Sequence, residues 1–274
     1  MIKDRLYYSN IIVNKIEENR EIIIKNIELQ VKKGSNFIFF TIDNLLPVED
    51  VMEIYSKFPK KEEMREKKNL REYKLIEAQL NNHDRILEEI TYSFQEKKVI
   101  NSIASIIGKD DIIADEFLYA GGLSRMEEGN YLNPHLDNSH DKDRSLYRVL
   151  NLLYYITPNR EIEDGGNLEL WDKGLKNDQT VIHSKFNRLA IMVTNKESWH
   201  GVSKVKKGNR CCVSNYYFSK KPMSTDDYFH VTSFRGFPDQ KIKDIILQGD
   251  TILRTSIRKL FPKGIVKNNH IYKK

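Results

Sequence analysis

The sequence predicts an α+β protein with a mainly β core of the jelly-roll or cupin type, flanked by helices on both sides of it in the chain. From Phe117 onward, short apolar runs of strand length alternate with turn residues, and about eight such runs suit two facing antiparallel sheets. Before this point, and again near the C-terminus, apolar residues recur at helical spacing. With 274 residues, the chain is long enough to bury a large core.

We expect a single domain over residues 1–274. Within it, N-terminal strands and supporting helices are expected over residues 1–116, and the β core over residues 117–235. A C-terminal helix and tail are expected over residues 236–274. The 39% of hydrophobic residues against 31% of charged residues is typical of a globular protein.

The first 36 residues give a mixed signal. Ile11–Val13 and Ile22–Leu29 are rich in β-branched residues and predict strands, although the residues between them, 14–21, are helical in composition. A further strand is expected over Asn36–Ile42, which is rich in Phe and Ile.

Three helices are expected before the β core. Pro47–Phe58 carries apolar residues at helical spacing with a proline near its start, and His83–Ser93 and Gln95–Ile107 are amphipathic. Gly108 is expected to end the last of these helices. We interpret the charge run Lys60–Lys68 as a solvated loop or helix end rather than a binding patch.

The strands of the core are expected between glycine-rich turns. The turn signals are Gly121-Gly122, Gly129-Asn130, Asp164–Asn167 and Lys207–Asn209. The runs of strand length between them include Leu146–Ile156, Leu168–Trp171, Arg188–Thr194 and Arg210–Phe218. Phe229–Phe234 is a candidate for one extra strand.

A helix is expected near the C-terminus. Asp239 is the expected N-cap, and the apolar positions that recur at helical spacing are Ile242, Ile245, Ile246 and Leu253. The tail from Gly264 is rich in Lys and Asn, which predicts a frayed end.

Charge and cysteine content limit the partners and the compartment. The net charge of +6 comes from lysines spread along the whole chain, which disfavours nucleic acid as a partner, whereas a mildly basic surface suits acidic substrates. Cys211 and Cys212 are adjacent and on a strand would point to opposite faces, so a reducing compartment is expected.

The segment Met1–Leu6 does not resemble a secretory signal, and no stretch approaches the roughly 20 apolar residues that cross a bilayer. We therefore expect a cytoplasmic protein.

Two histidines and a carboxylate are the candidate metal ligands. His135 and Asp137 stand two residues apart, and on a strand this spacing puts both side chains on one face. His200 opens another β-rich stretch, and Arg210 follows it ten positions later. Taken alone, a His-x-Asp pair is common on protein surfaces. Two histidines and one carboxylate together are the ligand set of a non-haem Fe(II) oxygenase, in which the remaining metal positions stay open.

In this order of residues the chain resembles the Fe(II)/2-oxoglutarate-dependent oxygenases, and it is most similar to a bacterial subgroup of their prolyl-4-hydroxylase-like branch. The family order is His-x-Asp, an aromatic strand, a Gly-Gly turn, a distal His and then Arg or Lys. The chain supplies these as His135/Asp137, Leu152–Ile156, Gly165-Gly166, His200 and Arg210. The resemblance covers roughly residues 119–235 and implies a double-stranded β-helix core, with the helices packed on its outside in a supporting role.

The resemblance also implies roles for individual residues. His135, Asp137 and His200 would bind Fe(II), and Arg210 would grip the far carboxylate of 2-oxoglutarate; these four are the expected catalytic residues. The remaining cofactor-binding candidates are Tyr155, Ser214 and Val202. Because halogenases of the superfamily have Gly or Ala in place of the carboxylate ligand, the resemblance implies hydroxylation or desaturation.

The residues support the expected role of Arg210 independently. On a strand, Arg210 shares a face with Ser214 and with the two alternate residues Cys212 and Tyr216, and that face is expected to line the barrel interior. A buried guanidinium needs a carboxylate partner, which 2-oxoglutarate would supply. An ion pair with a protein acid remains the alternative for Arg210, and a simple core position remains the alternative for Tyr155.

Substrate contacts are less defined by the sequence. The candidates are Arg148, Asn138, Arg144 and Trp199, for each of which a surface or packing role is equally open. The expected activity is that of an Fe(II)- and 2-oxoglutarate-dependent dioxygenase, which hydroxylates an unactivated C–H bond and releases succinate and CO2. A protein or peptide residue of prolyl type and a small metabolite or sugar of glycan biosynthesis are both open as substrates.

The alternative function is a non-oxidative cupin-like metal-binding protein or a Zn-dependent protein on the same fold. Arg210 discriminates between the two readings, because a plain metal-binding cupin has no need of a buried carboxylate clamp. The sequence leaves the oligomeric state open.

Overall fold

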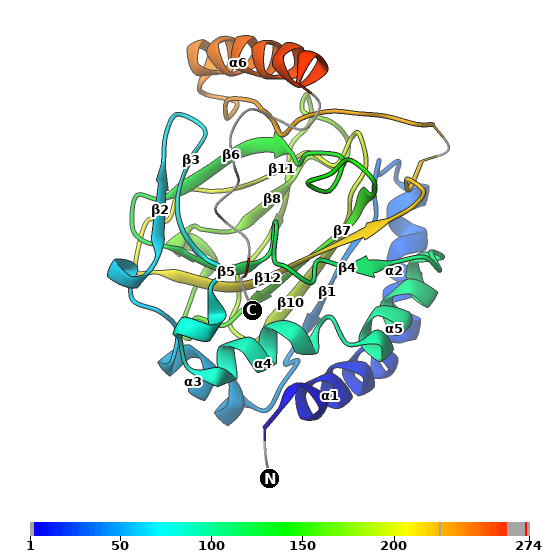
Figure 1. Ribbon diagram of the computed structural model, residues 1–274, viewed down its shortest axis with the longest axis vertical. Helices are drawn as coiled ribbons and strands as arrows, with labels where there is room; N and C mark the ends of the chain where they lie inside the picture. Colours follow the sequence, from blue (N-terminus) through cyan, green and yellow to red (C-terminus); the bar gives the residue numbers. More distant parts are fainter. Residues whose placement is uncertain (1–2, 225, 262–271, 273–274) are drawn as a thin grey trace.

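The apolar runs of the central region form one continuous, curled sheet in the computed structural model, which describes residues 3–224, 226–261 and 272 (Figure 1). The helices are α1 (Arg5–Glu18), α2 (Arg20–Lys32), α3 (Val48–Ser56), α4 (Arg85–Ser93), α5 (Lys97–Ile107) and α6 (Lys241–Leu260). The strands are β1 (Phe39–Asp43), β2 (Arg65–Lys68), β3 (Glu72–Glu77), β4 (Ile113–Ala114), β5 (Gly122–Met126), β6 (Tyr131–Leu136), β7 (Tyr147–Tyr155), β8 (Leu168–Leu170), β9 (Thr180–Ile182), β10 (Arg188–Val193), β11 (His200–Val202), β12 (Arg210–Ser219) and β13 (Ser233–Phe234). Short 3-10 turns lie at Lys61–Glu63, Leu80–Asn82 and Ile162–Asp164.

The sheet follows the path β1-β10-β7-β12-β5-β3-β6-β11-β8-β9, with β2 added to β3, β4 to β12 and β13 to β6. Every pairing between these strands is antiparallel. Because the sheet curls, side chains from β5, β6, β7, β8, β11 and β12 line a common cavity. The predicted jelly-roll fold of the double-stranded β-helix type is confirmed. The sheet also includes β1, β2, β3 and β4, which lie outside the range expected for the β core.

Alternation along β12 separates a dry core from the cavity. Cys211 and Val213 face the large hydrophobic core, whereas Arg210 and Ser214 point into the cavity. The same alternation applies to Tyr217 and Tyr216, which lie in the core and the cavity respectively. The interior face inferred for this strand from its sequence is therefore present.

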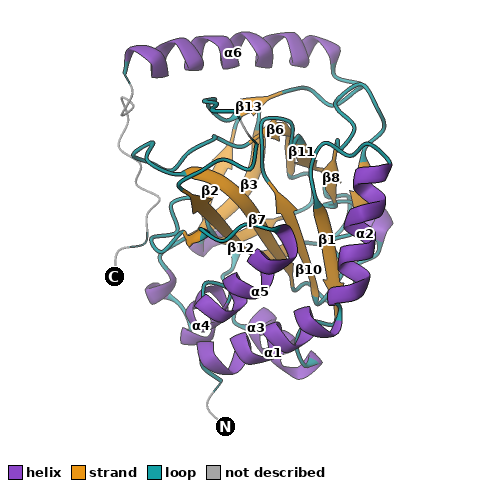
Figure 2. Ribbon diagram, turned by 90° about the vertical axis from the view of Figure 1, so that its right-hand side faces the viewer, coloured by secondary structure: helices purple, strands orange, loops and turns teal. Residues whose placement is uncertain are grey.

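Helices α1 to α5 pack beside the sheet, whereas α6 lies across its far end (Figure 2). Tyr8, Ile12 and Ile16 form one buried face of α1 at a spacing of four residues, and they share the large core with Ile90 of α4 and Ile103 of α5. Each such side chain contributes about 1.5–3 kcal/mol when it is fully buried. These helices therefore hold the sheet from outside.

The two strands predicted in the first 36 residues are wrong. Ile11–Val13 lies in α1, which begins at the N-cap Asp4, whose carboxylate accepts a hydrogen bond from the Tyr7 N–H at 2.8 Å. Ile22–Leu29 lies in α2. β-branched residues favour strands by local preference. Here the helix forms because it buries a face of residues spaced i, i+4 against the core.

The charge run Lys60–Lys68 also differs from its prediction. It forms a 3-10 turn followed by β2, which pairs with β3 to make a hairpin. Strand β3 was not predicted, because its six residues carry both acid and base and only two of them, Leu75 and Ile76, are buried. The pairing of β3 with β5 and β6 fixes this hairpin in the sheet.

The other predicted elements are present with small changes of boundary. The strand expected over Asn36–Ile42 is β1, and the three helices expected before the core are α3, α4 and α5. Gly108 follows α5 with φ +69°, a conformation that favours glycine. Of the extra strand expected over Phe229–Phe234, only β13 forms.

Helix α6 differs from the N-terminal helices in how it is held. Its N-cap is Gln240, one residue after the expected Asp239. Leu247 is its one fully buried side chain, while Ile242 and Ile245 are 78% and 71% exposed. Asp244 on the helix accepts two hydrogen bonds from Arg235 at 2.7 and 2.8 Å. Ionic contacts therefore replace much of the apolar packing.

Two sequence-based expectations concern the ends and the membrane. The tail predicted from Gly264 lies outside the described residues, apart from Tyr272, which is buried. Over the ranges that the structure describes, no helix is both long enough and apolar enough to span a membrane.

Candidate metal centre and its cavity

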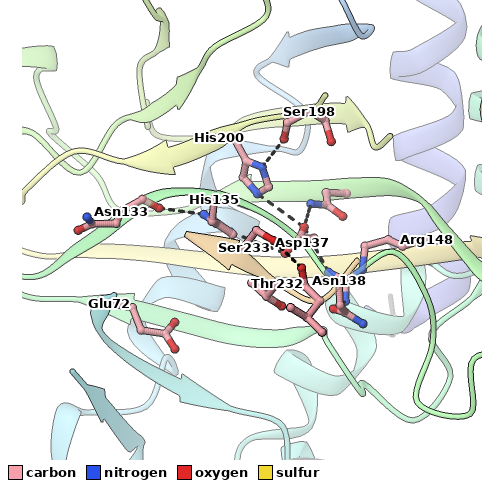
Figure 3. Close-up of polar contacts among 12 residues, drawn as sticks. Glu72, Asn133, His135, Asp137, Asn138, Arg148, Ser198, His200, Thr232 and Ser233 are labelled. Atoms are coloured by element: carbon pink, nitrogen blue, oxygen red, sulfur yellow. Dashed lines mark hydrogen bonds and ion pairs between the residues drawn. The ribbon is translucent and has the colours of Figure 1, made fainter. Parts of the chain in front are cut away.

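His135, Asp137 and His200 meet at the junction of β6 and β11. His200 lies directly opposite His135 in the register of these two strands, and Asp137 follows the end of β6 by one residue. One potential ligand atom from each residue lies within 4.8 Å of the other two (Figure 3). Gly201 permits this approach, because a Cβ at that position would stand 3.0 Å from the Leu132 carbonyl oxygen.

Backbone carbonyls fix the orientation of both imidazoles. The Nδ1 atom of His135 lies 3.0 Å from the carbonyl oxygen of Asn133, and Nδ1 of His200 lies 2.9 Å from that of Ser198. A carbonyl oxygen can only accept, so each Nδ1 carries the proton and donates it, which leaves the Nε2 lone pair free. Burial, together with the neighbouring His200, lowers the pKa of His135 to about 3, and burial also lowers the pKa of His200. Both rings are therefore neutral, as metal ligands must be.

Asp137 is held as a carboxylate between the two rings. Its oxygens lie 3.7 Å from Nε2 of His135 and 3.6 Å from Nε2 of His200. Asn151 donates a hydrogen bond to Asp137 at 2.6 Å, and Arg148 lies 3.2 Å from the same oxygen. Burial opposes ionisation, but Arg148 and the hydrogen bond from Asn151 hold the pKa of the Asp137 carboxyl well below its ordinary range. The three side chains thus offer two neutral nitrogens and one anionic oxygen, which suits a divalent transition metal.

Arg210 lies buried in the wall of the same cavity without an acidic partner. It is 3% exposed, and none of the ion pairs among the described residues includes it. Its guanidinium lies 4.8 Å from the ring centre of Tyr155, and its Nη1 donates to the Met126 sulfur at 3.8 Å. Its Nε and the Tyr155 hydroxyl have no hydrogen-bond partner among the residues that the structure describes. Burial raises the pKa of Tyr155 to about 12, although Arg210 opposes the shift. An unpaired buried guanidinium is costly, so this end of the cavity is suited to a bound anion.

The cavity has a volume of about 390 Å³, which is the size of a small-molecule site. Its walls contain the three candidate metal ligands together with Arg210, Ser214 and Val202. Tyr155 is not in the lining but contacts Arg210 from behind. The cavity therefore joins a metal-binding triad to an unpaired cation.

A sequence model of the 2OG-Fe(II) oxygenase superfamily matches residues 121–218, a range that contains both histidines, Asp137 and Arg210. The match assigns residues 121–218 to the 2OG-Fe(II) oxygenase superfamily, and these residues include the His-Asp-His group. No curated protein sequence matches this oxygenase.

Two solved structures show the same fold as this oxygenase. One is a prolyl-4-hydroxylase from Pseudomonas putida, with 14% identity, a TM-score of 0.53 and coverage of 72% of this chain and 99% of the other. The second is a prolyl 4-hydroxylase from Phytophthora capsici, also with 14% identity, a TM-score of 0.54 and coverage of 92% of this chain and 77% of the other. The fold of the oxygenase is thus that of prolyl 4-hydroxylases.

The cofactors of the superfamily, Fe(II) and 2-oxoglutarate, fit this site. The His-Asp-His group has the donor set that non-haem Fe(II) requires, and the unpaired Arg210 is matched to a carboxylate. The oxygenase is therefore a dioxygenase that uses Fe(II), with 2-oxoglutarate and O2 as cosubstrates.

The four predicted substrate-contact residues of the oxygenase fall into two groups. Arg148 and Asn138 line the cavity and share a hydrogen bond of 2.8 Å. Arg144 and Trp199 are not among the lining residues: Arg144 lies over the ring of Phe229 at 3.6 Å, and the Trp199 carbonyl accepts a backbone hydrogen bond. The structure thus brings only the first pair to the metal centre.

Several lining residues of the oxygenase were missed from the sequence. Four of them are partly exposed cations, which we call the rim cations: Lys67, Arg71, Lys74 and Arg254. Alternation within β3 is the one signal that could have placed Glu72 and Lys74 on a common face. Phe234 was also missed, and it stacks on the His135 ring at 5.2 Å.

Proposed function

We propose that this chain is an Fe(II)- and 2-oxoglutarate-dependent hydroxylase in which His135, Asp137 and His200 are the metal ligands. The observation that carries the proposal is one cavity that holds this triad together with the buried, unpaired Arg210. When bound, Fe(II) with 2-oxoglutarate and O2 supplies the oxidation of an unactivated C–H bond, with release of succinate and CO2.

The protein contributes fixed orientation at the metal. The two backbone carbonyls that accept from Nδ1 hold each imidazole so that Nε2 faces Asp137. Arg148 and Asn151 hold the Asp137 carboxylate ionised and in place before the metal binds. Three preset ligands leave the rest of the metal's coordination to cosubstrate and O2.

Arg210 serves as the clamp for the far carboxylate of 2-oxoglutarate. Its planar guanidinium can donate two parallel hydrogen bonds to a carboxylate. In this proposal Ser214, which is in the lining, and the Tyr155 hydroxyl, which belongs to a residue in contact with Arg210, donate further hydrogen bonds, and Val202 supplies an apolar surface for the carbon chain. The two buried polar atoms without a partner here, Arg210 Nε and the Tyr155 hydroxyl, thus belong to residues assigned to the cosubstrate.

Arg148 and Asn138 face the substrate side of the cavity in this proposal. The substrate is a peptide or protein residue of prolyl type, or a small metabolite or sugar of glycan biosynthesis. Arg148 also pairs with Asp137, so it links substrate binding to the position of a metal ligand. Arg144 and Trp199, which lie outside the lining, have no part in this contact.

We further propose that residues 1–274 form a single oxygenase domain, because β1 to β3 join the sheet of the core. A cytoplasmic location is proposed as well. It is supported by Cys211 and Cys212, which are free, buried thiols.

Anaerobic titration of the apoprotein with Fe(II), then with 2-oxoglutarate, tests the function. The expected result is the weak visible charge-transfer band of a bidentate keto acid on Fe(II). Arg210→Met is expected to need much more 2-oxoglutarate for the same band. Iron binding without a band in the wild-type protein would favour the non-oxidative or Zn-dependent alternative.

A further inference from the structure

The β2–β3 hairpin directs two like charges at the metal cavity. Lys67 on β2 lies directly opposite Lys74 on β3 in the antiparallel register, and both side chains line the cavity. Like charges directly opposite each other on one face of a sheet are destabilising. A pair of lysines kept in this position beside a metal centre is suited to binding an anion.

Within the part of the chain that the structure describes, one acid pairs with these two lysines. Glu72 forms an ion pair with Lys74 at 2.9 Å, whereas Lys67 has no ion pair or hydrogen bond among the described residues. Burial, and then the charge of Lys74, lower the pKa of Lys67. Lys74 and Lys67 together hold the pKa of Glu72 at about 2 in spite of its burial. Lys67 is therefore the cation left without a partner.

A second excess of positive charge lies beside the hairpin. Arg71 and Arg254 share the single carboxylate of Asp250, at 3.5 and 2.9 Å. Both guanidinium groups also lie over the ring of Phe234, at 5.9 and 6.0 Å, and this ring stacks on His135. The positive rim is thus built onto the wall next to a metal ligand.

The rim cations are separate from the clamp at Arg210. Lys67 and Lys74 belong to the β2–β3 hairpin, whereas Arg210 belongs to β12, and strand β5 lies between β3 and β12 in the sheet. We therefore assign the anion at the hairpin to a group other than the carboxylate assigned to Arg210.

We propose that the substrate of this oxygenase carries an anionic group, a phosphate, sulfate or carboxylate, which Lys67 and Lys74 bind while Arg71 and Arg254 flank it. The inference rests on the proposed function, because that function is what makes the bound anionic molecule a substrate. Lysine ammonium groups bind such groups as mobile point charges, which suits a partly open rim.

Calorimetric titration of the anaerobic enzyme, loaded with Fe(II) and 2-oxoglutarate, tests this proposal. The probes are phenyl phosphate and benzoate, with benzamide as the neutral analogue. At least one of the two anions is expected to bind while the charge-transfer band persists, and benzamide is expected to bind more weakly. Lys67→Met should weaken the binding of that anion roughly tenfold, the value of one charge-assisted hydrogen bond.

Lys68→Met is the matched control. Lys68 is the next residue of β2, is exposed, and is absent from the cavity lining. Its replacement should leave binding of the anionic probe unchanged. The proposal would be overturned if the two variants bound the anion equally well, or if neither anion bound the wild-type enzyme. It would also be overturned if benzamide bound as tightly as the anions. Loss of the charge-transfer band on addition of the anion would also overturn it, because the anion would then occupy the place of 2-oxoglutarate.

Thermal unfolding without ligand gives an independent readout. Removing one of two facing like charges should raise the unfolding midpoint of Lys67→Met above those of the wild type and Lys68→Met. A midpoint at or below the wild-type value would contradict the repulsion on which the inference depends. Failure of the proposed function can be told apart, because the wild-type protein would then form no charge-transfer band before any anion is added. In that case the calorimetric comparison of the Fe(II)-loaded variants would still decide whether Lys67 binds anions.

Discussion

The cavity holds its cations in two ways, in the buried part that carries the metal triad and Arg210, which we call the enclosed end, and at the partly exposed rim. Arg210 is buried in β12, a strand paired on both sides, and forms no ion pair with any residue that the structure describes. Arg71 and Arg254 are a quarter to a third exposed, share Asp250, and come from a hairpin and a terminal helix. A buried, unpaired cation suits a cosubstrate that is the same in every reaction cycle. Cations on separate, partly exposed elements can be replaced in related enzymes without disturbing the metal centre. In the two proposals made above, the chemistry of the superfamily lies at the enclosed end, and substrate selectivity lies at the rim.

The largest expected effect comes from the enclosed end. Asp137→Ala removes one metal ligand and leaves Arg148 buried without its carboxylate. Fe(II) affinity should fall at least about a hundredfold, and unfolding should cost several kcal/mol less, because breaking a buried pair destabilises by about 3–5 kcal/mol. Metal titration and denaturant unfolding measure the two effects. Asp143→Ala, an exposed change in the following loop, is the control, and an Asp137 variant that still binds Fe(II) normally would refute the ligand assignment.

Arg210→Met should have the next largest effect. The affinity for 2-oxoglutarate should fall roughly a hundredfold, since a buried charge pair of this kind contributes about 2–5 kcal/mol. The apoprotein should be as stable as the wild type or more so, because the unpaired guanidinium is replaced by an apolar side chain. The charge-transfer band and unfolding curves report these quantities. Arg188→Met, which breaks a pair with Asp43 away from the cavity, should leave cosubstrate affinity unchanged.

A smaller effect is expected at the rim. Asp250→Asn frees Arg71 and Arg254 from their shared carboxylate, and all three side chains are partly exposed. The free energy of unfolding should therefore fall by no more than about 1 kcal/mol. Titration with 2-oxoglutarate should show wild-type affinity. A large loss of cosubstrate affinity would mean that the rim and the enclosed end are one site.

The smallest effect is expected on the outer face of α6. Ile245 is 71% exposed, so Ile245→Ser should change the free energy of unfolding by less than about 0.5 kcal/mol. Leu247→Ala, two residues away and buried, should cost at least about 2 kcal/mol. Chemical denaturation compares the two variants. Equal losses would show that the outer face is covered in solution.

The sequence determined the metal centre by itself. The chain carries a His-x-Asp pair, then a distal histidine and, ten positions after it, a basic residue. When the segments that carry them form neighbouring β strands, these side chains come together in one cluster. The face of β12 that carries Arg210 and Ser214 followed from simple alternation. These features depend on local spacing, which the order of residues contains.

The tertiary structure alone decided the N-terminal helices and the rim. Burial of Tyr8, Ile12 and Ile16 in the large core, where α1 packs against α4 and α5, overrode the strand preference of β-branched residues. Lys67 points into the cavity only because β2 pairs with β3 in one register, and a shift of one residue would turn it to the opposite face. Register and burial depend on contacts between distant segments, so no local pattern in the charge run could reveal them.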